Sequence, residues 1–251
     1  MQFVRKSFFG PKNLSNRKKK YFSLLKEKGL IESVHIKKVS NTKAIYDFYQ
    51  ENSKHVDLSY GTDDTKKSLV SCARHRCCFC GRYFEDNEEM SKTNFKVFSI
   101  EHFYEECNYP LKILNWNNLF PSCKDCNGNR GSKPLHYLYS PSSIRFKRDV
   151  KKLLYLSNGT ISTCNDDLKS LLEAYGLNSD RLKYERREFY KQISNPDFAR
   201  VLRLEKENDV YKNQCIIFID EYQNYLLNKK RTEKMKSCKL FKMIEEVAVN
   251  E

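Results

Sequence analysis

Two pairs of cysteines have the spacing of metal ligands. They are Cys77 and Cys80 in CCFCGRYF, and Cys123 and Cys126 in PSCKDCNGN. A two-residue spacer lets both thiolates of a pair face one ion, and two such pairs complete a closed tetrahedral zinc site. A closed site leaves no position for water, so the sequence predicts a structural zinc, with Cys78 as a spectator inside the first pair.

A second group of polar residues lies between the two pairs and directly after them. Glu101 and His102 close the apolar segment FKVFSI, and Asn118 precedes the second pair. Asn127 follows that pair directly, and Arg130 comes three positions later. A zinc that joins the two pairs would therefore also fix the segment that carries these side chains.

The order of these motifs resembles that of the HNH endonuclease superfamily, whose core is a ββα-metal finger. The closer resemblance is to the nuclease component of Septu-type and retron-associated anti-phage systems. It is carried by IEHF (100–103), YPLKILNWNNLFPSC (109–123), CNGNRGSK (126–133) and YGLNSDRLKYERR (175–187), within a little under half of the chain.

The resemblance implies a role for each polar residue. His102 would be the general base, and Asn118 would orient it and tie the loop together. Glu101 and Asn127 would bind one catalytic Mg²⁺ or Mn²⁺. These roles suit phosphodiester hydrolysis, which needs a base for the attacking water and a divalent cation for the phosphate. The generic motif more often has Asp at the position of Glu101, and Asn129 competes with Asn127 for the third position.

Basic residues are concentrated at both ends of the chain. The net charge is +14, of which residues 1–40 contribute +9 and residues 229–242 contribute +6. Such a distribution is typical of a protein that binds a polyanion. The alternative is that these are solvated helix faces, kept basic for solubility. The predicted nucleic-acid contacts are Arg17, Lys18, Lys19 and Lys20, and, from the resemblance, Arg130 or Lys133.

The predicted fold class is α+β and mostly helical, with a central zinc-stapled ββα-metal (HNH) finger between helical flanks. We expect a basic helical region at 1–62, a zinc-stabilised nuclease core at 63–150 and a helical region at 151–251 that contacts a partner or nucleic acid. Helices are predicted at 15–28, 63–73, 166–178, 179–193 and 196–228. Residues 77–133 lack periodicity, except for a strand at 95–100.

The remaining cysteines and the apolar segments favour an intracellular protein. Six further cysteines lack ligand spacing, and we expect them to be small buried apolar residues: Cys72, Cys78, Cys107, Cys164, Cys215 and Cys238. No segment has the length of a membrane span or the pattern of a signal peptide. The sequence therefore predicts a soluble cytoplasmic protein.

The function that we expect is that of a metal-dependent HNH endonuclease, with DNA favoured over RNA as substrate. The resemblance implies that it is the effector subunit of an anti-phage system and works with an ATPase partner. The alternative is a non-catalytic subunit, stabilised by zinc, that binds nucleic acid or serves as a scaffold.

A first prediction concerns the basic N-terminal segment. Phosphate contacts release counterions, so binding to duplex DNA should weaken with salt at a log–log slope of about −0.9 per neutralised phosphate. Neutralising Arg17, Lys18, Lys19 and Lys20 together should flatten this slope without changing the chemistry at His102. If the segment instead meets an acidic partner, the variant will bind DNA normally and fail to co-purify with the ATPase. If the variant changes neither DNA binding nor co-purification, the basic residues serve only to keep the protein soluble.

Overall fold

The computed structural model describes residues 1, 4–7, 10–33, 41–82, 84, 98–131 and 135–193. The chain divides into two compact units. The first comprises residues 1–150 and 173–177, and the second comprises residues 151–172 and 178–251. The helix predicted at 196–228, the basic segment at 229–242, Lys133 and the first part of the predicted strand lie outside the described residues.

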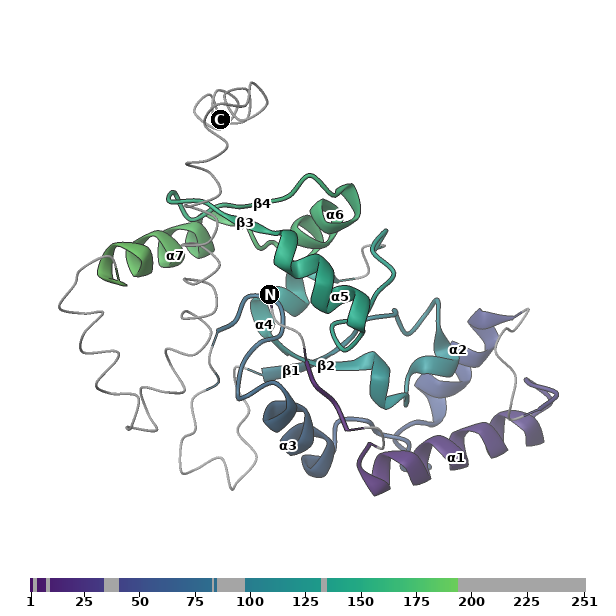
Figure 1. The fold of residues 1–251 in the computed structure, drawn as a ribbon. Coiled ribbons are helices and arrows are strands. Elements are labelled where there is room, and N and C mark those ends of the chain that lie inside the picture. Colours follow the sequence, from purple (N-terminus) through teal and green to yellow (C-terminus); the bar gives the residue numbers. More distant parts are fainter. Residues whose placement is uncertain are drawn as a thin grey trace. The chain divides into compact units, whose positions relative to one another are not determined.

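The first helix of unit 1, α1 (Lys12–Glu27), has clear start and stop signals (Figure 1). It begins after Pro11, whose fixed φ suits a helix start. It ends before Gly29, which has a φ of +66°, a conformation that favours glycine at a helix end. Its buried residues lie at helical spacing on one face: Leu14, Tyr21 and Leu25.

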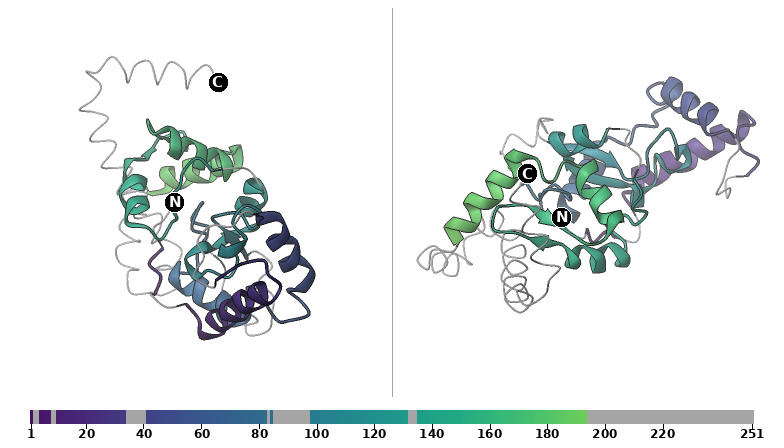
Figure 2. Two further views of the ribbon diagram at one scale, coloured as in Figure 1. Left: turned by 90° about the vertical axis from the view of Figure 1, so that its right-hand side faces the viewer. Right: turned by 90° about the horizontal axis from the view of Figure 1, so that it is seen from above.

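Two shorter helices follow. In α2 (Thr42–Asn52), the Asn41 side chain caps the first turn by accepting a hydrogen bond from the Ala44 amide at 2.9 Å. α3 (Asp63–Cys72) begins with two aspartates, which are favourable at the positive end of the helix dipole. Helices α1 and α2 lie side by side (Figures 1 and 2), because the Tyr21 and Tyr49 rings pack edge to face with centroids 5.5 Å apart.

The centre of unit 1 is an antiparallel pair of strands followed by a helix. Strand β1 (Phe98–His102) pairs with β2 (Leu119–Cys123), so that Phe98 lies opposite Cys123 and His102 lies opposite Leu119. All five residues of β2 are buried. Helix α4 (Lys124–Arg130) follows β2 at once and contacts both strands, while α3 contacts β2. These five-residue strands and the seven-residue helix are too short for a periodic signal, which is why periodicity alone missed β2 and α4.

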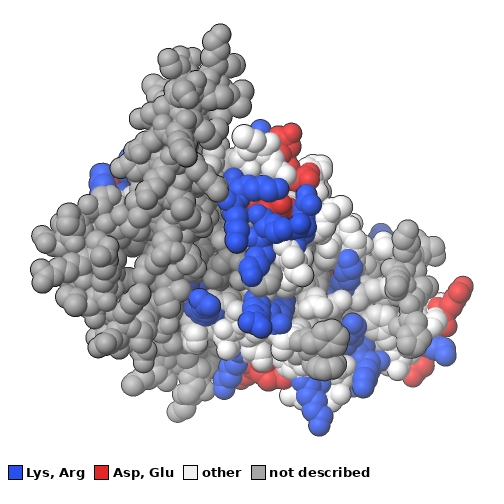
Figure 3. Space-filling model, in the orientation of Figure 1, with Lys and Arg blue, Asp and Glu red and all other residues white. Residues whose placement is uncertain are grey.

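Three short helical segments complete unit 1. Two 3₁₀ helices, η2 (Pro110–Lys112) and η3 (Trp116–Asn118), lie in the connection between β1 and β2. Helix α5 (Ile144–Asp149) is capped by Ser143 and exposes three basic side chains, Arg145, Lys147 and Arg148. Basic side chains gather over α5 on the face seen in Figure 3.

Unit 2 contains a small hairpin and several helical elements. Its elements are η4 from residue 151 on (Val150–Lys152), β3 (Leu154–Tyr155), β4 (Ile161–Ser162), α6 up to residue 172 (Asp166–Ala174) and α7 (Asp180–Ile193). Asn178 binds Ile161 at both backbone groups, donating to its carbonyl and accepting from its amide at 2.8 Å. Arg186 donates to the Gly159 carbonyl at 2.6 Å, which ties α7 to the hairpin.

The structure confirms the α+β class and the four predicted helices that fall on described residues, which are α1, α3, α6 and α7. Helix α2 was not predicted. None of the described helices is long and apolar enough to cross a membrane.

Candidate functional site

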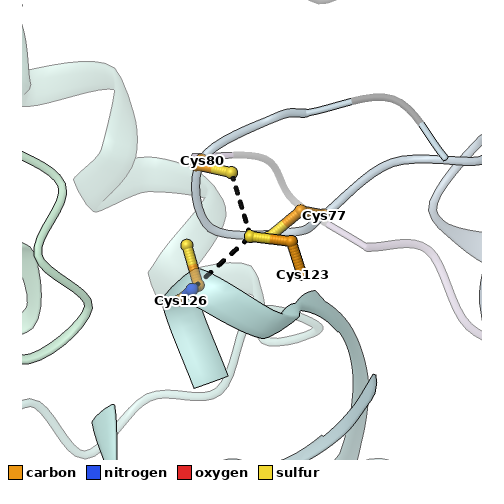
Figure 4. A group of neighbouring side chains, drawn as sticks. All are labelled: Cys77, Cys80, Cys123 and Cys126. Atoms are coloured by element: carbon orange, nitrogen blue, oxygen red, sulfur yellow. Dashed lines mark hydrogen bonds between the residues drawn. The ribbon is translucent and has the colours of Figure 1, made fainter. Parts of the chain in front are cut away.

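The four predicted zinc ligands come together in unit 1. The sulfur atoms of Cys77, Cys80, Cys123 and Cys126 all lie within 4.8 Å of one another (Figure 4). Cys80 Sγ and Cys123 Sγ are 3.6 Å apart. Zinc binds thiolates at about 2.3 Å in a tetrahedron, which requires sulfur atoms roughly 3.8 Å apart. The cluster therefore has the size and donor set that one zinc ion needs, and three of its four members are buried.

The first pair is shaped by a tight turn. Gly81 has a φ of +83°, and its amide donates to the Cys77 carbonyl at 3.0 Å. This turn brings both thiols of the pair to one side. The amide of Cys78 donates to the Pro121 carbonyl in β2 at 3.0 Å, so the spectator residue joins the turn to the sheet through its backbone.

The second pair is shaped by the start of α4. Cys123 ends β2 and caps α4, because its sulfur accepts a hydrogen bond from the Cys126 amide at 3.4 Å. Arg82 and Asp125 form an ion pair of 2.7 Å that joins the two pairs at the surface. One residue, Cys123, thus serves as strand end, helix cap and candidate ligand.

The thiols influence one another's ionisation. Burial raises the pKa of Cys77, but hydrogen bonds with the thiols of Cys123, Cys126 and Cys80 together lower it well below its ordinary value. The pKa of Cys123 is lowered as well, whereas contacts within the cluster raise the pKa of Cys80 and of Cys126. The thiolate, which is the form that binds a metal ion, is therefore favoured at Cys77 and Cys123.

The other cysteines follow the expectation only in part. Cys78 is buried and Cys72 is half-buried, but Cys107 and Cys164 are exposed, so the prediction that they are buried was wrong. Both lie in turns between elements, where no core covers them. Cys215 and Cys238 lie outside the described residues.

His102 ends β1 with its ring buried and both ring nitrogens in contact with an oxygen. Nε2 lies 2.9 Å from the Ile113 carbonyl oxygen, and Nδ1 lies 2.9 Å from Glu106 Oε1. The Tyr60 ring packs edge-on against the imidazole, with centroids 4.5 Å apart. A carbonyl oxygen only accepts hydrogen bonds, so Nε2 carries a proton and Nδ1 faces the carboxylate.

Glu106 is a residue of this site that the sequence analysis missed. Burial raises the pKa of its carboxyl, but the hydrogen bond and charge of His102, with a hydrogen bond from Tyr60, produce a net lowering. Glu106 lies four positions after His102 in FYEEC. Residues four positions apart come into contact only where the chain turns. Nothing in the sequence indicated a turn directly after β1.

Glu101 faces the opposite side of β1, as alternation along a strand requires. Its Oε1 accepts a hydrogen bond from the Tyr175 hydroxyl at 3.0 Å and lies 3.9 Å from Arg130 Nε. The Tyr175 ring in turn stacks on Phe79, beside the cysteine cluster, with centroids 3.6 Å apart. Burial raises the pKa of Glu101 to about 8, although the contacts with Tyr175 and Arg130 oppose this.

Asn118 closes the connection between the strands. Its side-chain oxygen accepts from the Tyr104 amide at 2.7 Å, and its Nδ2 donates to the carbonyls of Tyr104 and Lys112 at 2.9 and 3.1 Å. Lys6 holds the other side of this connection, since its ammonium donates to the carbonyls of Trp116 and Leu119. Burial lowers the pKa of Lys6 to about 7.

A pocket of about 560 Å³ opens beside the His102–Glu106 pair. Its walls include Tyr60, Glu106, Asn127, Lys54, Lys66 and Ile100. Glu101 is not among the described residues that line it. Asn129 points elsewhere, because its amide donates to the Tyr175 carbonyl at 3.5 Å. Of the predicted oxygen ligands, the structure therefore brings Asn127, but not Glu101, to this pocket.

The predicted phosphate contacts are in different environments. Arg130 is buried, with its Nη2 2.6 Å from Glu105 Oε1. Arg17 is engaged by the side chains of Asp57 and Thr62. Burial lowers the pKa of Lys18. The last two residues of the basic run, Lys19 and Lys20, are exposed on α1.

A second prediction is that the protein binds about one zinc ion at the cysteine cluster. Replacement Cys123→Ser should remove the zinc and severely destabilise unit 1, because structural zinc in zinc-finger peptides contributes about 10–16 kcal/mol to folding. Elemental analysis measures the zinc, and thermal unfolding with and without a chelator measures the stability.

Two controls separate the ligands from their neighbours. Cys107→Ser changes an exposed thiol, and Cys78→Ser changes the buried thiol inside the first pair. Both variants should retain one zinc. Soluble, folded wild-type protein without zinc would contradict the prediction.

Comparison with known proteins supports the expected relation to a Septu protein. No model of a known protein family matches the chain. Over 142 residues the chain is 28% identical to the Septu protein PtuB of Bacillus thuringiensis, and the match covers 55% of this chain and 50% of that protein. The chain thus spans about half the length of this curated relative, and the similarity relates it to a Septu protein.

Proposed function

We propose that the protein is a metal-dependent HNH endonuclease, the effector subunit of a Septu-type anti-phage defence system that works with an ATPase partner. DNA is the favoured substrate and RNA is the alternative. The partial similarity to a Septu protein supports the defence role.

One observation carries the nuclease proposal. Strands β1 and β2 and helix α4 form a single unit around the cysteine cluster, with His102 at the end of β1, Asn118 directly before β2 and Asn127 in α4. This is the order of residues in the motif that the sequence resembles. A zinc ion that joins both ends of the segment would hold these side chains in a fixed relation.

His102 and Glu106 would act together on the attacking water. Nε2 donates to Ile113 and Nδ1 lies 2.9 Å from the Glu106 carboxylate, so a proton that the pair accepts would be held between Nδ1 and Glu106. The proton from a water molecule in the pocket would therefore be accepted by the pair, of which Glu106 lines the pocket. Tyr60 contacts both His102 and Glu106, and it would hold the two side chains in their relative positions.

A divalent cation would neutralise charge on the phosphate and on the leaving oxygen. Carboxylate and amide oxygens suit Mg²⁺ or Mn²⁺, and Asn127 is available at the pocket wall. Glu101 does not fit as it lies, because its oxygen accepts from Tyr175 and the cationic Arg130 is 3.9 Å away. Glu101 and Glu106 therefore compete for the role of carboxylate ligand.

The proposal is tested by incubating the purified protein with plasmid DNA and with total RNA in Mg²⁺, with and without the neighbouring ATPase. Cleavage that requires Mg²⁺ and is stopped by a chelator of divalent cations would support a nuclease. No cleavage of either substrate with the partner present would contradict it.

A third prediction is that His102→Ala abolishes cleavage while zinc content and folding remain. Removal of a general base lowers the rate by about 10²–10⁴-fold. A matched control is His55→Ala, which removes an exposed histidine after α2 and should leave the rate unchanged. Wild-type activity in His102→Ala would exclude the catalytic role.

A fourth prediction separates the two carboxylates. If Glu101 binds the cation, Glu101→Gln should raise the Mg²⁺ concentration needed for half-maximal cleavage more than it changes nucleic-acid affinity. Glu106→Gln should then lower the rate at saturating Mg²⁺, because it disturbs the partner of His102. The reverse pattern, with the metal requirement shifted by Glu106→Gln alone, would assign the ligand role to Glu106.

A non-catalytic, zinc-stabilised subunit that binds nucleic acid or serves as a scaffold is the second candidate. The occupied ring of His102 favours it, since Ile113 and Glu106 engage both nitrogens. Tight nucleic-acid binding or stable association with the ATPase, without cleavage under any of the conditions above, would support this function.

A further inference from the structure

A second, smaller cavity lies just beyond the residue that ends β1. Its volume is about 140 Å³, and its lining includes Phe103, Tyr104, Tyr109, Tyr137, Asn108 and Arg130. Binding sites for drug-sized ligands measure about 300–1,000 Å³, so this cavity has room for a single small ring system. All of its lining residues belong to unit 1.

Arg130 lines the cavity and has hydrogen-bond donors without a partner. The residue is 1% exposed, yet its Nε and Nη1 have no hydrogen-bond partner in the structure. A buried polar group without a partner is costly, which points to a ligand that would supply an acceptor. The positive charge is already balanced, since Nη2 lies 2.6 Å from Glu105 and Nε lies 3.9 Å from Glu101. A neutral ligand with an acceptor therefore fits better than an anion.

Tyrosine rings form part of the cavity wall, and the exposed ring of Tyr109 offers a flat ligand a surface to stack on. Tyr104 and Tyr109 lie with ring centroids 5.2 Å apart, and Tyr109 is 42% exposed. Lys112 places its ammonium 3.4 Å from the centre of the Tyr104 ring. Aromatic side chains stack on nucleobases regardless of sequence, and a lysine beside them can meet the phosphate of the same strand.

We propose that this cavity binds one unpaired nucleobase, so that the substrate is single-stranded nucleic acid or an unpaired loop. A base inside a duplex cannot enter such a pocket unless it is flipped out of the stack. Because Phe103 and Tyr104 directly follow His102, a nucleotide bound in the cavity would contact residues that adjoin His102 in the chain. The inference rests on the proposed nucleic-acid substrate and does not require cleavage.

The test measures binding in the absence of divalent cations, so that cleavage does not contribute. The probes are a labelled DNA or RNA hairpin with a four-nucleotide loop, the same hairpin with abasic loop positions, and a fully paired duplex of equal length. Tyr109→Ala is the test variant. Tyr139→Ala is the matched control, because Tyr139 is 45% exposed and is not among the described residues that line the cavity.

The wild-type protein should prefer the hairpin to both other probes. Tyr109→Ala should weaken hairpin binding by roughly 5- to 150-fold and leave duplex binding unchanged, while Tyr139→Ala changes neither. This pattern would support the pocket even if no cleavage is ever observed. Equal affinity for the three probes, or an equal effect of Tyr109→Ala on hairpin and duplex, would overturn it.

Discussion

The contact on which the rest of unit 1 depends is the cluster of four thiols. It joins Cys80 and Cys123, which are 43 positions apart, and Cys123 is also the end of β2 and the cap of α4. Small sheets and short helices have little stability of their own. A metal ion at this point would join the turn of the first cysteine pair to the end of β2 and the start of α4, and its binding would add to the stability of these short elements.

Strand β1 separates two groups of ionisable side chains that differ in their surroundings. On one face, Glu101 is enclosed by Tyr175 and Arg130, and Tyr175 stacks on the turn that carries the first cysteine pair. On the other face, His102 meets Glu106 beside an open pocket. The first arrangement anchors a residue from far along the chain to the sheet. The second places the Glu106 carboxylate at the wall of an open pocket, with the buried His102 ring behind it.

The sequence predicted what depends on local spacing. Two CxxC pairs specify a tetrahedral cluster because each pair needs only one turn, and cap residues marked the ends of α1 and α6. Long-range partners could not be predicted in this way. Tyr175 reaches Glu101 across 74 positions, and nothing in its own neighbourhood indicates this. Glu106 was missed because two glutamates adjoin in FYEEC, and only the backbone turn after β1 decides which of them meets His102.

The position of the two ionisable side chains on consecutive residues has a consequence for how this protein can evolve. Side chains alternate along a strand, so a deletion or insertion of one residue between Phe98 and Glu101 would exchange the faces of the residues beyond it and take Glu101 away from Tyr175. Gain or loss of single codons should therefore be eliminated from this stretch, even where the amino acids themselves are free to vary.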